Sequence, residues 1–224
     1  GAASANVPAI LVTGGPQLSG FFRGKHVGSG TDFWHYSYEV RLGRMSVEEY
    51  REFEAALCRS HGHCMEMATA ATMAACGEAL GMTLPDGAAI PAVDSRRAVL
   101  AERSGRRAVE LAGEGLKPSD VMTRDAFENA VRVLMATGGS TNAVIHLLAI
   151  AGRLGVELTL DDFARASDTP VITNLRPSGQ YLMEDFFNAG GIAAVMGELL
   201  TILHGKAVTV TGRSVGENVA SRRS

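Results

Sequence analysis

The stretch from Cys64 to about Leu80 constrains the fold more than any other part of the chain. It reads CMEMATAATMAACGEAL and combines good helix formers with side chains that are small on several faces. A helix with such a surface packs closely against several neighbours, so we expect it to be deeply buried. Gly81 is expected to end it, because glycine readily adopts the left-handed conformation that follows a helix. The chain should therefore contain one long, deeply buried helix.

Capping signals and periodicity predict further helices along the chain. Ser46 and Glu49 form a capping box, and Asp94 can cap a helix, or two helices that meet near Ser104 and Gly105. The expected helices cover residues 32–42, 46–57, 94–112, 123–138, 141–154, 160–166, 181–187 and 192–203.

Three short apolar segments, residues 7–13, 171–174 and 207–211, predict strands, whereas the glycine-rich residues 19–32 predict an exposed loop. The strands are few and are separated by helices. We therefore expect an α/β fold: a three-layer, helix-rich domain around a mostly parallel sheet, truncated at both ends.

Composition limits the classes of protein to which the chain can belong. Its 224 residues are 46% hydrophobic and 20% charged, with a formal net charge of -3, which is typical of a globular protein. Basic residues form no stripe, so we expect no nucleic-acid partner. No apolar run reaches about 18 residues and the first residues lack a signal-peptide pattern, so we expect no membrane span and a cytoplasmic location.

Cys64 carries the strongest chemical signal. A thiol at the N-terminus of a helix feels the positive end of the helix dipole, which favours the thiolate form. A thiolate binds iron or zinc, or attacks an electrophile. The alternative is a buried structural cysteine, and position alone gives the two interpretations similar weight. Cys58 and Cys76 are more typical of residues without a chemical role.

Two histidines beside Cys64 leave a zinc- or thiol-based enzyme open as a further hypothesis. His61 and His63 precede the cysteine in the order His-Gly-His-Cys. A structural zinc site needs a second pair of ligands at a defined spacing, and the sequence offers none.

The sequence Gly-Gly-Ser-Thr-Asn at 138–142 is a candidate anion-binding turn. Free backbone N–H groups at the start of the next helix, together with Ser140, Thr141 and Asn142, could hold a carboxylate or a phosphate. The same pattern is more typical of a plain helix cap formed by Ser140.

Several segments together resemble the dihydroxy-acid and sugar-acid dehydratase family, and they span nearly the whole chain. They are, in order, VPAILVTGGP, GHCMEMATAATMAACGEALGMTLP, IPAVD, GGSTNAVIHLLAIAGRLGVELTLDDF, NLRPSGQYLMEDFFNAGGIAAVM and LHGKAVTVTGRSVGEN. Three segments look most similar to the arabonate and xylonate dehydratase branch: FFRGKHVGSGTDFWHYSYEVRLGRMS, AVDSRRAVLAERSGRRAVEL and PSGQYLMEDFF.

The resemblance implies a hydro-lyase that removes water from a sugar acid (an aldonic acid) or a 2,3-dihydroxy acid and gives a 2-keto acid. It implies an iron–sulfur cluster, of the 2Fe-2S type rather than the 4Fe-4S type, with Cys64 as one ligand. It also implies Mg2+ and a homo-oligomeric full-length enzyme. The dihydroxy-acid dehydratase of branched-chain amino-acid synthesis is the alternative within the family.

The chain also departs from the family pattern. The Cys-Asp-Lys motif, the catalytic serine and a downstream magnesium carboxylate of the family are not found in it, so only Cys64 carries over as a ligand. Ala68 and Ala71 replace the usual glycine and serine. One thiolate does not hold a cluster that needs several ligands. We therefore expect an internal fragment that is inactive alone, with a non-catalytic binding module of the same fold as the alternative.

The resemblance also implies a division into domains. Residues 1–205 are expected to form part of the N-terminal α/β cluster-binding domain. Residues 206–224 are expected to begin a β-rich swivelling domain.

Overall fold

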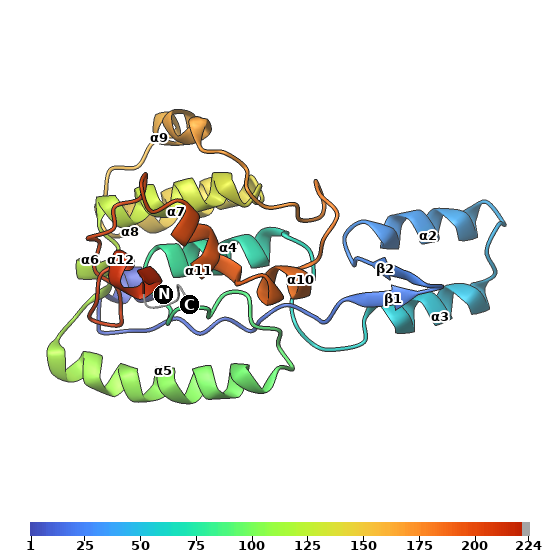
Figure 1. Cartoon of the computed structure of the whole chain (residues 1–224), viewed down its shortest axis with the longest axis horizontal. Helices are drawn as coiled ribbons and strands as arrows, with labels where there is room; N and C mark the ends of the chain where they lie inside the picture. The colour runs from blue at the N-terminus through green and yellow to red at the C-terminus, as the bar shows by residue number, and fades with distance from the viewer. Residues whose placement is uncertain (221–224) are drawn as a thin grey trace.

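The computed structural model describes residues 1–220. Figure 1 shows a helical body, a long helix α5 that runs along one side of it, and an arm at the right that consists of β1, β2, α2 and α3. The elements are α1 (Ala2–Ala5), β1 (Gly20–Phe22), β2 (Lys25–Val27), α2 (Asp32–Arg41), α3 (Val47–Leu57), α4 (Thr69–Ala79), α5 (Ser95–Glu114), α6 (Pro118–Val121), α7 (Arg124–Ala136), α8 (Asn142–Arg153), α9 (Leu160–Arg165), η1 (Ala166–Asp168), α10 (Met183–Asn188), α11 (Gly191–Glu198) and α12 (Val215–Ala220).

The small-residue helix α4 is buried, as its sequence predicts, and it lies at the centre of the body. Its residues from Ala74 to Ala79 are all buried, and it packs on α7 and also contacts α8 and α11. Short side chains let these helices approach closely, and the resulting core takes in most of the apolar residues of α7, α8 and α11. Gly81, with a φ of 78°, follows the last turn and ends the helix.

The arm has a small core of its own. The hairpin of β1 and β2 packs on α3 through Phe22, Val27 and Phe53, and the rings of Phe22 and Phe53 meet edge to face. Residues 19–32, expected to be a loop, thus contain two antiparallel strands in the register Gly20 to Val27. Arg23 and Gly24 form the turn and both have positive φ, as a tight hairpin requires.

The helix-rich α/β class is confirmed, but the parallel sheet is not formed by the described residues, whose only sheet is the two-stranded hairpin. None of the three segments predicted as strands forms a ladder in the part of the chain that the structure describes. In residues 7–13 the N–H of Leu11 donates to Met82, and in residues 171–174 that of Ile172 donates to Ala136. Residues 207–211 make a single bridge, from Val208 to Ser214. A strand needs a partner backbone along its length, and within residues 1–220 these segments find only isolated contacts.

Several helix boundaries also differ from the prediction. The central helix begins at Thr69 instead of Cys64, and α11 ends at Glu198 instead of residue 203. The helix after Asp94 is continuous through Ser104 and Gly105, so the two-helix alternative is wrong. Helix α12, Val215–Ala220, is not among the predicted helices.

The segment after residue 205 packs into the same core as α4. Ala207, Val210, Val215 and Val219 are buried there, and the N–H of Val210 donates to Gly81. The division into domains at residue 206 stays a prediction, and residues 221–224 of the expected second domain lie outside the described part.

Helix α5 is attached to the rest of the chain at its first turn. Asp94 caps it and accepts a hydrogen bond from the N–H of Arg96 at 2.8 Å. The guanidinium of Arg97 is buried and donates to the carbonyls of Thr13, Gly87 and Ile90. The helix is amphipathic and charged, and no helix within residues 1–220 is long and apolar enough to cross a membrane.

Replacing Arg97 by alanine should lower the free energy of unfolding by about 3 kcal/mol, because three carbonyls, two of them in buried contacts, lose a charged donor. Arg106→Ala is the matched control on the same helix, since its exposed pair with Glu102 contributes at most about 0.5 kcal/mol. Urea unfolding of both variants measures the difference. Equal losses of stability in the Arg97→Ala and Arg106→Ala variants would show that the Arg97 contacts do not anchor α5.

Asp94→Ala should lower the stability by about 1 kcal/mol at pH 7. The Arg96 guanidinium and N–H lower the pKa of Asp94 to about 2 from its ordinary value of 3.8. The contribution of Asp94 is therefore present above the ordinary pKa and is lost as the pH falls toward 2. Urea unfolding at pH 7 and at pH 2.5 tests this sign, and a difference between variant and parent that does not shrink at low pH argues against it.

Candidate functional site

Cys64 lies in the irregular segment between α3 and α4, not at the first turn of a helix. The segment is held extended because Met65 is buried in the core of the arm and Met67 in the core of the body. The N–H of Met67 donates to the carbonyl of Arg176, and the backbone of His63 pairs with the segment Gly15–Gln17. The argument from the helix dipole therefore does not apply to Cys64.

The sulfur of Cys64 has two polar neighbours. The hydroxyl of Ser29 lies 3.2 Å from Sγ, and the N–H of Glu66 donates to Sγ at 3.5 Å. The side chain is half-buried, so the sulfur is held by the protein without being enclosed. These contacts suit a thiolate, which accepts hydrogen bonds from both groups.

The other two cysteines do not share this environment. Cys58 is exposed at the end of α3. Cys76 is fully buried in α4, and burial raises the pKa of its thiol to about 12. Cys76 therefore stays protonated near neutral pH, as the prediction of a core residue requires.

A buried carboxylate adjoins Cys64. Glu66 is 2% exposed, and its Oε1 accepts hydrogen bonds from the N–H and the hydroxyl of Thr31 at 3.0 and 2.6 Å. The loop Gly28-Ser29-Gly30 wraps around this carboxylate so closely that a methyl group added at Gly28 or Gly30 would overlap its oxygens. The glycines are needed here for close approach and not for an unusual φ.

Arg176 fixes the same loop from the other side. It forms an ion pair with Asp32, whose Oδ2 also accepts the N–H of Gly28 at 2.7 Å. A further hydrogen bond joins the Arg176 guanidinium to the carbonyl of His26 at 3.4 Å. The loop that carries Ser29 is thus tied to two distant segments of the chain.

The histidines next to Cys64 do not form a metal site with it. His61 is exposed, and Nδ1 of His63 lies 3.0 Å from the carbonyl oxygen of Cys64. Burial lowers the pKa of His63, so its ring is neutral near pH 7. No group of three His, Cys, Asp or Glu side chains converges within residues 1–220, which removes the structural basis of the zinc hypothesis.

The turn at 138–142 meets the start of α4, a few residues after Cys64. The hydroxyls of Ser140 and Thr69 lie 3.0 Å apart, and the amide of Asn142 donates to Thr69 at 2.9 Å. Ser140 Oγ also accepts the N–H of Asn142 at 3.3 Å, which is the expected capping contact, whereas Thr141 is exposed. The starts of α4 and α8 are therefore joined by side chains.

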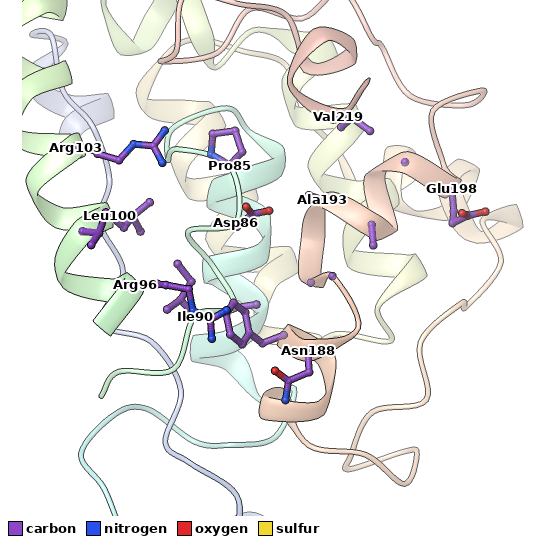
Figure 2. A pocket seen from close by; sticks show the side chains of 17 residues that line it. Pro85, Asp86, Ile90, Arg96, Leu100, Arg103, Asn188, Ala193, Glu198 and Val219 are labelled. Atoms are coloured by element: carbon purple, nitrogen blue, oxygen red, sulfur yellow. The ribbon is translucent and has the colours of Figure 1, made fainter. Parts of the chain in front are cut away.

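A cavity of about 640 Å³ lies away from Cys64, between α5 and the pair α10–α11. Figure 2 shows Arg96 and Arg103 of α5 on one wall and Asn188, Ala193 and Glu198 on the other. Arg96 pairs with Asp94 and lies over the ring of Phe187, so it is used to attach α5 to α10. None of the residues predicted for the site lines this cavity.

Comparison with known proteins agrees with the resemblance seen in the sequence. Residues 1–218 match the family described as Dihydroxy-acid/6-phosphogluconate dehydratase N-terminal. The chain belongs to this family. An L-arabinonate dehydratase of Rhizobium leguminosarum bv. trifolii is 55% identical over 98% of the chain and 38% of its own length.

Two other relatives represent further activities within the family. A D-xylonate dehydratase of Caulobacter vibrioides is 45% identical over 100% of the chain and 38% of its own length. A dihydroxy-acid dehydratase of Sulfurisphaera tokodaii is also 45% identical, over 96% of the chain and 39% of its own length. The chain thus spans well under half the length of these relatives.

Sequence reasoning did not single out Ser29, Glu66 or Arg176. The glycine-rich loop at 24–30, predicted only as an exposed loop, lies against the buried carboxylate of Glu66. Nothing in the sequence pairs the loop with Arg176, which lies far along the chain.

Gly30→Ala should lower the free energy of unfolding by about 2 kcal/mol, because the new methyl group overlaps the pinned Glu66 carboxylate. Glu66→Ala in the same chain should remove most of this added cost, so the two changes are not additive. Gly105→Ala in α5, where the methyl group meets open space, is the control and should stabilise by about 0.5–1 kcal/mol. Urea unfolding of the single and double variants tests the coupling; additive losses would contradict it.

Proposed function

We propose that this chain is part of a dehydratase that removes water from a sugar acid or a 2,3-dihydroxy acid to give a 2-keto acid. The observation that carries the proposal is the environment of Cys64, a half-buried sulfur within hydrogen-bond distance of a hydroxyl and an N–H group, in a chain that belongs to a dehydratase family. The relatives named L-arabinonate and D-xylonate dehydratase favour a pentonic acid as the substrate.

Cys64 is proposed as one thiolate ligand of an iron–sulfur cluster, of the 2Fe-2S type. The residues present fit a single ligand position and no more, because no three metal-binding side chains converge within the described part of the chain. The remaining ligands, and those of Mg2+, would have to come from other parts of the full-length enzyme. When bound, the cluster iron would supply Lewis acidity toward the leaving hydroxyl group.

The turn with Ser140, Thr141 and Asn142 is proposed to lie close to the substrate carboxylate. Hydroxyl groups and a side-chain amide at the starts of α4 and α8 suit an anion. Thr141 is exposed and its side chain makes no capping hydrogen bond, so its hydroxyl is the group best placed to donate to a bound anion. A dihydroxy-acid dehydratase remains the alternative within the family. A cytoplasmic location and a homo-oligomeric enzyme are part of the same proposal.

Cys64→Ala in the full-length protein should abolish cluster loading and the formation of 2-keto acid from pentonic acids, because the cluster loses a ligand. Cys58→Ala is the matched control, since Cys58 is exposed and should leave both unchanged. Iron and sulfide analysis and an assay of 2-keto acid measure the two properties.

Full loading in the Cys64→Ala protein would refute the assignment of the ligand. The parent protein should be compared on a pentonic acid and on a branched 2,3-dihydroxy acid. Faster turnover of the branched acid would favour the dihydroxy-acid alternative.

A further inference from the structure

We propose that Ser29 is a positioning residue that donates a hydrogen bond to the Cys64 thiolate and so tunes the cluster bound there. This inference rests on the proposed function, because it takes Cys64 to be a cluster ligand. Its own basis is the distance of 3.2 Å between the Ser29 hydroxyl and Sγ of Cys64.

Ligation decides the direction of this hydrogen bond. In a free thiol, either the serine or the cysteine can be the donor. A thiolate bound to iron carries no proton, so Ser29 must donate and the sulfur must accept. The N–H of Glu66 points at the same sulfur from 3.5 Å and adds a second, weaker donor.

The loop that carries Ser29 is held in place by hydrogen bonds and by an ion pair. Thr31 donates twice to the buried Glu66 carboxylate, and the two flanking glycines leave no space between the loop and that carboxylate. Asp32 is held by Arg176 and by the N–H of Gly28. A hydroxyl on such a loop loses little conformational freedom when it forms its hydrogen bond.

A hydrogen bond to a ligand sulfur has a measurable consequence. It withdraws electron density from the sulfur and stabilises the more negatively charged, reduced cluster. Ser29 should therefore raise the reduction potential of the cluster and weaken the Fe–S(Cys64) bond, without itself being a ligand.

The test compares Ser29→Ala, Ser29→Thr and the parent in the full-length, cluster-loaded protein. Ser29→Ala should retain iron and sulfide, shift the midpoint potential to a more negative value in a dye-mediated titration, and shift the Fe–S(Cys) stretching band in resonance Raman spectra to a higher frequency. Ser29→Thr keeps the hydroxyl and should restore both values. Ser167→Ala changes an exposed serine of η1 and should match the parent.

A loaded Ser29→Ala protein with the potential and the stretching band of the parent would overturn the inference and leave the ligand role of Cys64 intact. Loss of the cluster in Ser29→Ala but not in Ser29→Thr supports it, whereas loss in both shows that the site needs the shape of serine and overturns it. If Cys64→Ala retains the cluster of the parent, the proposed function itself fails.

Discussion

The buried carboxylate of Glu66 is the constraint on which the candidate site depends. A charged group with 2% exposure is costly to bury unless hydrogen bonds replace those it made with water. Thr31 supplies two such bonds, so the loop at 28–31 must pass directly over the carboxylate. That approach is possible only with glycine at 28 and 30, and it brings the residue between them, Ser29, to the sulfur of Cys64.

The same short segment joins the two cores of the molecule. Met65 is fully buried in the arm and Met67 in the body, so the backbone between them cannot turn into a helix without removing one methionine from its core. This explains why α4 begins at Thr69 and not at Cys64. It also means that the position of Cys64 is fixed by the packing of Met65 on one side and Met67 on the other.

Local signals predicted the helices well and the strands poorly. A cap such as Asp94, or the pair Ser46 and Glu49, satisfies the first N–H groups of its own helix, so the sequence contains both partners of the interaction. A strand has its partner elsewhere in the chain. The apolar run at 7–13 carries strand propensity, yet the backbone of Leu11 finds a single contact with Met82 and no ladder. The arm hairpin was missed because its Arg-Gly turn lacks the usual asparagine or aspartate.

The candidate site at Cys64 also depends on contacts between residues that are far apart in the sequence. Resemblance to a family identified Cys64, and glycine content predicted only that residues 19–32 form a loop. Neither signal could identify Glu66 as the carboxylate under the loop or bring Arg176 to Asp32, because these partners are far apart in the sequence. Glycines in a loop indicate that another group comes close to the backbone, but they do not identify that group. In this chain that group is the internal carboxylate of Glu66, and the loop that lies over it places Ser29 beside the sulfur of Cys64.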